Sequence, residues 1–245
     1  MPERKYRTAL FENYVSTLAP EQSDGNTPTF TVQCASGLCR LKKWLPPGQS
    51  IKCLDLGCGS GYAMRALRSA GYSDVLGIDV SSQAADLARK AGFKVTEAEL
   101  REYLLECNEC YDLITAFDVI EHFDKNEVLE VLQLIWKRLK VGGTLILQTP
   151  NALSPWVNSL RYGDLTHEVI YSSKCLASLL VLTGFSNVET REVAPCAHGL
   201  KGLIRWPLWK AVWLGYAVWN VAETGSLLGG VYSRNMLVRA TKTQV

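Results

Sequence analysis

The protein has 245 residues, a length typical of one domain, and its 26 Lys and Arg against 24 Asp and Glu give a formal net charge of +2. With 47% hydrophobic and 20% charged residues, the chain can bury a large core, which excludes a disordered protein. A charge this close to zero gathers no phosphates over long range, so we expect no nucleic-acid partner.

The eight cysteines do not indicate a disulfide framework, because the chain opens MPERKYRTAL without an apolar signal segment. We therefore predict a reduced, cytoplasmic protein. Cys107 and Cys110 form a CxxC pair, but no second pair lies at zinc-finger spacing. The pair is interpreted as ordinary thiols in preference to a metal or redox site.

In chain order, residues 1–50 predict an N-terminal helical cover, with helices around Thr8–Leu18 and Ala35–Trp44. Apolar runs and helical patterns then alternate through residues 51–150. Five strands are expected there, at IKCLDLG, VLGIDV, FKVTEA, YDLITAFDVI and GGTLILQTP. This alternation predicts a doubly wound α/β fold, in which helices cover both faces of a parallel sheet.

The regular alternation ends after residue 150. An irregular stretch is followed by a predicted helix near Lys174–Thr183 and a predicted strand, SNVETREV. A tryptophan-rich segment separates that strand from the last one, RNMLVRATK.

A glycine-rich loop follows the first predicted strand, where open α/β sheets bind ligands. It contains Gly57, Cys58, Gly59 and Gly61, and it is preceded by Asp55. The spacing is not the G-x-G-x-x-G of dinucleotide sites, and the Asp55 carboxylate would repel a pyrophosphate. The same carboxylate would attract a cationic ligand.

Further acidic residues follow the next two strands. Asp79 and Val80 end the second strand, about 20 residues after the loop, where a carboxylate can accept hydrogen bonds from ribose hydroxyls. Glu99 and Leu100 follow the third strand, and Glu99 could face an adenine amino group. This set suits S-adenosylmethionine, which is positively charged and carries no phosphate; the alternative is that the acids cap helices.

The segments LDLGCGSG, GIDVS, FDVIEHF and LKVGGTLILQTPN together resemble the class I S-adenosylmethionine-dependent methyltransferases over Leu54–Asn151. The resemblance implies a Rossmann-like, seven-stranded, mostly parallel sheet with an antiparallel last strand. It also implies a role for each of the following: Asp55 and the loop glycines around the methionine moiety, Asp79 on the ribose, Glu99 and Leu100 at the adenine, and Phe117 under the cofactor.

With this resemblance, we expect one domain of five consecutive parts. They are the helical cover (1–50), the cofactor-binding core (51–150), an acceptor-side segment (151–198), a helical insertion (199–232) and the last strand (233–245).

The segments VIEHF, LQTPN and GDLTHEVIYSSKCLASLLVLTGF resemble methyltransferases of the ubiquinone-biosynthesis type, including bacterial enzymes of surface-glycan pathways. This resemblance implies O-methylation of a small or lipid-linked acceptor, of the sugar or glycan class or the isoprenoid or quinone class. The alternative is a non-catalytic protein that binds a partner or a membrane through its aromatic insertion.

Two histidines are candidates for the general base that an oxygen nucleophile needs. His122 lies just past the fourth strand, and His167, flanked by Asp164 and Tyr171, follows the fifth. The alternative for each is a hydrogen bond that organises a loop.

A divalent metal is a further alternative near the fourth strand. Asp118, Glu121 and His122 provide oxygen and imidazole ligands within five residues. Local helix capping by Glu121 explains the same pattern, and we predict no metal.

The insertion contains four of the seven tryptophans. Its predicted helix places the following aromatic residues within about 140° of one another: Trp206, Trp209, Trp213, Tyr216 and Trp219. From residue 199 onward, six basic residues against Glu223 give +5, which leaves −3 for the rest of the chain. We expect an interfacial helix or lid that contacts a membrane through residues 200–230; core packing and a dimer contact are the alternatives.

Overall fold

The computed structural model describes residues 10–11, 39–48, 50–196, 199–226 and 230–243. Of the predicted helix Thr8–Leu18, only residues 10–11 lie within these ranges, and they are helical. Of the predicted helix Ala35–Trp44, residues 39–41 are helical. The chain turns after them, because the backbone N–H groups of Trp44 and Leu45 both donate to the oxygen of Leu41.

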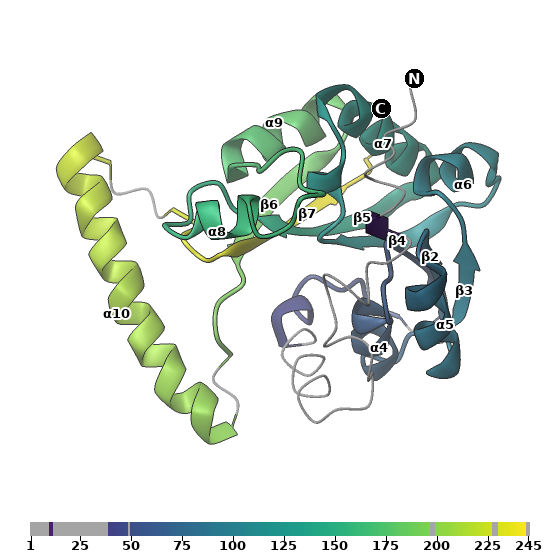
Figure 1. Cartoon of the computed structure of the whole chain (residues 1–245), viewed down its shortest axis with the longest axis horizontal. Coiled ribbons are helices and arrows are strands. Elements are labelled where there is room, and N and C mark those ends of the chain that lie inside the picture. Colours follow the sequence, from purple (N-terminus) through teal and green to yellow (C-terminus); the bar gives the residue numbers. More distant parts are fainter. Residues whose placement is uncertain (1–9, 12–38, 49, 197–198, 227–229, 244–245) are drawn as a thin grey trace.

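Seven strands form one sheet in the order β3-β2-β1-β4-β5-β7-β6, drawn in Figure 1. The strands are β1 (Lys52–Leu56), β2 (Asp74–Asp79), β3 (Lys94–Glu97), β4 (Tyr111–Phe117), β5 (Leu139–Pro150), β6 (Ser186–Glu192) and β7 (Asn235–Thr241). The first five are parallel, and β7 pairs antiparallel with both β5 and β6. The predicted doubly wound sheet with an antiparallel last strand is confirmed.

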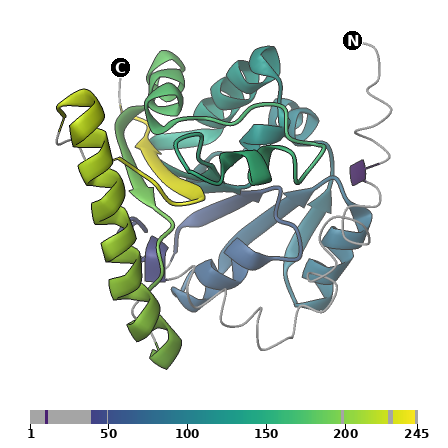
Figure 2. The same cartoon turned by 60° about the vertical axis from the view of Figure 1, so that its left-hand side comes forward.

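Helices cover both faces of the sheet (Figure 2). They are α4 (Tyr62–Ser69), α5 (Ser82–Lys90), α6 (Leu100–Glu106), α7 (Lys125–Arg138), α8 (Val157–Arg161) and α9 (Ser173–Leu182). Buried residues of α6, α7 and α9 share one apolar cluster, and those of α4 pack with Leu41 and Trp44 in a second. The core therefore consists of two layers separated by the sheet.

Local sequence fixes where these helices begin. The Ser81 hydroxyl accepts the backbone N–H of Ala84 at the start of α5, and Ser172 does the same for Cys175 at α9. Asp124 and Glu127 form a reciprocal capping box at α7. Each of these caps lies a few residues after a strand or a loop, at the edge of the sheet where the parallel strands end. Each cap therefore fixes a short turn at that edge.

The tryptophan-rich insertion is one 26-residue helix, α10 (Gly199–Thr224), which contains Pro207 and has no buried residue. It stands outside both helix layers, on the side of the molecule opposite β3 (Figures 1 and 2). The predicted helical insertion before the last strand is confirmed. Within the described ranges, no helix has the length and apolar character needed to cross a bilayer.

Candidate active site

The loop after β1 turns on glycines in the left-handed region of the backbone. The φ angles are 63° at Gly57, 54° at Gly59 and 91° at Gly61, values that residues with a Cβ rarely adopt. A Cβ on Gly57 would also lie 2.5 Å from Cγ2 of Val119, in the segment that follows β4. Glycine is therefore required at Gly57 by both the backbone conformation and the close approach of that segment.

The Asp79 carboxylate at the end of β2 holds this loop. Its Oδ2 accepts the backbone N–H of Gly59 at 2.7 Å, and its Oδ1 accepts that of Ser81 at 2.8 Å. Burial raises the pKa of Asp79, and the N–H groups of Ser81 and Gly59 oppose the rise. Among the described residues these backbone N–H groups use only part of the carboxylate's four lone pairs, so lone pairs are left for a ligand.

Asp55 lies on β1 and is buried, with 1% of its surface exposed. Its Oδ1 accepts the hydroxyl of Thr115 at 2.6 Å, whereas Oδ2 has no hydrogen-bond partner among the described residues. The pKa of Asp55 is raised to about 7, because burial and the Asp79 charge outweigh the lowering by the Thr115 bond. A buried carboxylate oxygen without a partner suits a cationic ligand.

The remaining predicted cofactor residues surround the same edge of the sheet. Glu99 is the N-cap of α6, and its Oε2 accepts the backbone N–H of Glu102 at 2.9 Å. The capping alternative for Glu99 therefore holds in this structure. Leu100 is buried, Val80 is exposed, and the ring of Phe117 lies 6.3 Å from that of Tyr62.

The chain after β4 departs from the predicted strand, which was expected to continue through residue 120. Asp118 adopts a left-handed φ of 55°, and a short 3-10 helix, η2 (Ile120–His122), follows. The Asp118 carboxylate accepts Nε2 of Gln148 at 2.8 Å and Nδ2 of Asn235 at 3.0 Å. These bonds tie the end of β4 to β5 and β7 and turn the next residues toward the acceptor-side segment.

His122 is brought against His167, with ring centroids 5.0 Å apart. Nε2 of His122 lies 3.1 Å from the backbone oxygen of Asp118, which only accepts, so Nε2 carries a proton. Nδ1 lies 2.8 Å from Oγ1 of Thr166. The pKa of His122 is lowered to about 4, mainly by burial and also by the neighbouring His167. Thr166 also donates its single hydroxyl proton to Oδ1 of Asp164 at 2.5 Å, so its oxygen serves both His122 and Asp164. Both nitrogens of His122 therefore lie against oxygens of the protein.

His167 has a different arrangement. Its Nδ1 lies 2.8 Å from the backbone oxygen of Leu160 and must donate to it. Its Nε2 lies 3.9 Å from Oδ2 of Asp164, which is too long for a hydrogen bond, and no described residue donates or accepts there. In the neutral ring Nε2 is the unprotonated nitrogen and can accept a proton.

Glu121 is fully buried between these groups. Its Oε2 accepts the hydroxyl of Thr149 at 3.0 Å, and its Oε1 has no partner among the described residues. Burial raises the pKa of Glu121, and Asp118 adds to the rise. Ligand atoms of Glu121, His122 and His167 lie within 4.8 Å of one another, so this set could hold a metal ion. The predicted metal alternative had Asp118 where this set has His167. The carboxylate of Asp118 is instead hydrogen-bonded to Gln148 and Asn235.

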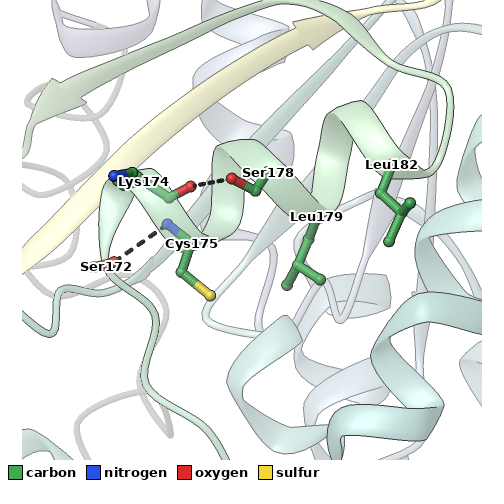
Figure 3. A pocket seen from close by; sticks show the side chains of 6 residues that line it. All are labelled: Ser172, Lys174, Cys175, Ser178, Leu179 and Leu182. Carbon is green, nitrogen blue, oxygen red and sulfur yellow. Dashed lines mark hydrogen bonds between the residues drawn. The ribbon is translucent and has the colours of Figure 1, made fainter.

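A hollow of about 450 Å³ lies elsewhere, along α9 (Figure 3). Its lining comes from one helix and the residue before it: Ser172, Lys174, Cys175, Ser178, Leu179 and Leu182. None of these is a predicted site residue. The candidate site is therefore defined by the buried polar groups at the carboxyl ends of the strands and not by this hollow.

Residues 11–190 match the model of a family described as the methyltransferase domain. The chain belongs to this family. It is a class I S-adenosylmethionine-dependent methyltransferase, an enzyme with S-adenosylmethionine as its cofactor.

Curated relatives of this methyltransferase match part of its length. A tRNA U34 carboxymethyltransferase of Desulfotalea psychrophila is 30% identical over 61% of this chain and 50% of its own length. The ubiquinone biosynthesis O-methyltransferase of Bordetella avium is 32% identical over 42% of this chain and 44% of its own. The mitochondrial enzyme of that name from Rattus norvegicus is 32% identical over 43% of this chain and 32% of its own length. The chain thus spans a third to a half of the length of these relatives.

Solved structures show the same fold at lower identity. A methyltransferase from Archaeoglobus fulgidus superposes with a TM-score of 0.65 at 19% identity, over 88% of this chain and 100% of its own. Magnesium protoporphyrin IX methyltransferase from Synechocystis, with bound SAH, gives a TM-score of 0.61 at 13% identity, over 98% and 100%.

Three polar residues of the methyltransferase site were missed by sequence reasoning. Thr115 bonds Asp55, Thr166 bonds His122, and Asn235 bonds Asp118. Two of them could have been found from the sequence, because Thr115 is a lone hydroxyl in an apolar strand and Thr166 is next to His167. Nothing in the sequence pointed to Asn235, because its partner Asp118 lies 117 residues away.

Proposed function

We propose that this methyltransferase transfers the methyl group of S-adenosylmethionine to a hydroxyl oxygen of a small or lipid-linked acceptor. The acceptor class is a sugar or glycan, or an isoprenoid or quinone, and the enzyme acts in the cytoplasm at the inner face of a membrane. The observation that carries the proposal is the pair of close imidazoles, His122 and His167, at the edge that holds the glycine loop. Relatives named ubiquinone biosynthesis O-methyltransferases support the same oxygen chemistry.

The proposed cofactor contacts come from the carboxyl ends of β1, β2 and β4 and from the start of α6. They are Asp55, Gly57, Cys58, Gly59, Gly61, Asp79, Val80, Glu99, Leu100 and Phe117. The unpartnered Oδ2 of Asp55 and the spare lone pairs of Asp79 fit a ligand with cationic groups and ribose hydroxyls. When bound, S-adenosylmethionine supplies a methyl group already activated by its sulfonium.

His167 is the proposed general base, and His122 positions it. The Nδ1–H of His167 is fixed by Leu160, so its Nε2 can take the proton of the acceptor hydroxyl. His122 uses both nitrogens in bonds to Asp118 and Thr166 and presents its ring to that of His167. Because methyl transfer is an in-line displacement, holding the acceptor oxygen and removing its proton are what these residues can contribute.

Replacing His167 by alanine is expected to lower the rate of methyl transfer by about 10²- to 10⁴-fold while leaving cofactor affinity unchanged. The measurement uses methyl-labelled S-adenosylmethionine and a bacterial membrane extract, separated into lipid and carbohydrate fractions. Calorimetry gives the affinity for S-adenosylmethionine.

The matched variant is His122→Asn, which changes the neighbouring ring. We expect it to lower thermal stability and to reduce the rate less than His167→Ala, since its nitrogens serve bonds within the protein. Full activity of His167→Ala would remove His167 from the chemistry. Absence of S-adenosylmethionine binding at millimolar ligand would leave the whole proposal without support.

The affinity for S-adenosylmethionine is expected to rise with pH through about 7. Burial raises the pKa of Asp55 to about 7, so the carboxylate that attracts the cationic ligand forms as the pH rises through that value. The free energy of unfolding depends on pH in the opposite direction. A folded-state pKa above the unfolded value of about 3.9 makes Asp55 lower the free energy of unfolding as the pH rises from about 4 to about 7.

The Asp55→Asn variant should bind S-adenosylmethionine more weakly at pH 8. It should also lose the pH dependence of the affinity and that of the stability, as measured by calorimetry and thermal unfolding at several pH values. Asp86→Asn, an exposed carboxylate paired with Arg89 on the same helix, is the control and should retain both. An unchanged pH dependence in Asp55→Asn would assign the titration to another group.

A further inference from the structure

Part of the aromatic side of α10 packs against its own protein, whereas Trp206 and Trp219 at its two ends are 45% and 69% exposed. Nε1 of Trp209 donates to Oε2 of Glu192 at 3.1 Å, and Nε1 of Trp213 donates to the backbone oxygen of Gly230 at 3.3 Å. The ring of Tyr216 lies 5.5 Å from that of Tyr232. Trp209, Trp213 and Tyr216 therefore hold α10 against the strand ends, and a membrane contact through residues 200–230 would involve the sides of the helix that these residues leave exposed.

The opposite side of α10 is aliphatic and exposed. At 100° per residue, a sector of about 140° carries no charged or hydrogen-bonding side chain along the whole helix. It consists of Leu200, Leu203, Ile204, Pro207, Leu208, Ala211, Leu214, Gly215, Val218, Val221 and Ala222. Six of the seven large aliphatic residues among them are 58 to 77% exposed, and Val221 is half-buried. A continuous apolar stripe of this length on a described surface indicates an interaction site.

Basic residues border this aliphatic sector on both sides. By the same spacing, Lys210 lies just outside one border and Lys201 just outside the other, with Arg205 beyond it. The acidic Glu223 is near the far end of the helix. All three cations are exposed. Long basic side chains in these positions can reach anionic headgroups while the sector between them enters the apolar region.

The topology places α10 at the edge of the sheet that carries the site. β6 runs parallel to β5, because both pair antiparallel with β7. Glu192 at the end of β6 and Asn235 at the start of β7 thus lie at the carboxyl edge, and Asn235 donates to Asp118 there. An acceptor held in a bilayer would be presented on this side of the molecule.

We infer that α10 docks in the plane of an anionic lipid bilayer through its aliphatic sector, with Lys201, Arg205 and Lys210 on the headgroups. At 26 residues the helix is about 39 Å long, which allows it to lie along the surface for its full length. The biological purpose of this docking rests on the proposed lipid-linked acceptor. The docking itself requires neither cofactor nor acceptor.

Vesicle sedimentation of the full chain tests the inference. The wild type should pellet with phosphatidylcholine vesicles that contain phosphatidylglycerol and much less with phosphatidylcholine alone. A triple variant, Leu203→Glu, Leu214→Glu and Val218→Glu, should lose at least ~100-fold in vesicle affinity. The matched control makes the same change at three comparably exposed aliphatic residues of the main fold, Leu105, Val141 and Val181, and should pellet like the wild type.

Three results would overturn the inference. Two of them are negligible pelleting of the wild type with anionic vesicles and equal pelleting of the two triple variants. The other is a wild-type dimer in sedimentation velocity that the α10 variant alone converts to a monomer without any vesicle binding, which would assign the sector to a second copy. None of these results would touch the methyl-transfer proposal, because S-adenosylmethionine binding and the labelled-methyl assay are measured separately on the same variants.

Discussion

Asp79→Ala should lose at least ~100-fold in affinity for S-adenosylmethionine, because it would remove the carboxylate that we propose accepts two hydrogen bonds from the ribose hydroxyls. The loop loses an anchor as well, since Oδ2 of Asp79 holds the backbone N–H of Gly59 at 2.7 Å. Titration calorimetry measures the affinity, and saturation kinetics at high cofactor separate binding from the rate of transfer.

The control is Asp86→Ala, which removes an exposed carboxylate from the adjacent helix. Its cofactor affinity should equal that of the wild type. Thermal unfolding of both variants shows how much of the Asp79 effect comes from the loop. Wild-type affinity in Asp79→Ala would exclude this carboxylate from the cofactor site.

Gly57→Ala is expected to lower the free energy of unfolding by about 2 to 5 kcal/mol and to abolish cofactor binding. An alanine here must adopt φ near 63°, and its Cβ would lie 2.5 Å from Cγ2 of Val119. Val119 immediately precedes η2, so relief of the clash moves both the glycine loop and the residues that lead to His122. Chemical denaturation and calorimetry measure the two effects.

Gly142→Ala separates the two causes. Gly142 has a φ of 81°, but no atom lies within 4 Å of the Cβ that the substitution adds. We expect a loss of about 1 to 2 kcal/mol from backbone strain alone, with cofactor binding intact. Equal losses in the two variants would contradict a role for the Val119 contact.

The sequence predicts the parallel half of the fold because each of its strands is a short apolar run between helical patterns. The boundaries fail where a tertiary contact ends an element. The predicted strand through residue 120 stops at Phe117, since Asp118 is held in a left-handed conformation by Gln148 and Asn235. The start of β5 at Leu139 was also missed, because its first residues, LKVGG, lack an apolar pattern.

The candidate site is predictable in its acids and glycines and less so in its geometry. Asp55 and Asp79 stand near strand ends that a parallel sheet brings to one edge, and His167 lies in the loop between α8 and α9. The proposed roles of His122 and His167 differ because different ring nitrogens are hydrogen-bonded. The partners of these nitrogens, Thr166 and Leu160, are brought there only by tertiary folding. Helical spacing likewise finds the aromatic side of α10 but does not say which side faces the protein.

The position of β7 between β5 and β6 has a consequence for synthesis of the chain. β6 pairs with β7 and not with β5, so it has no neighbour in the sheet until residues 235–241 leave the ribosome. Until then the growing chain exposes the edges of β5 and β6, and edges of this kind recruit other chains. A stop codon before residue 235 would therefore remove one strand, detach a second and leave an aggregation-prone product.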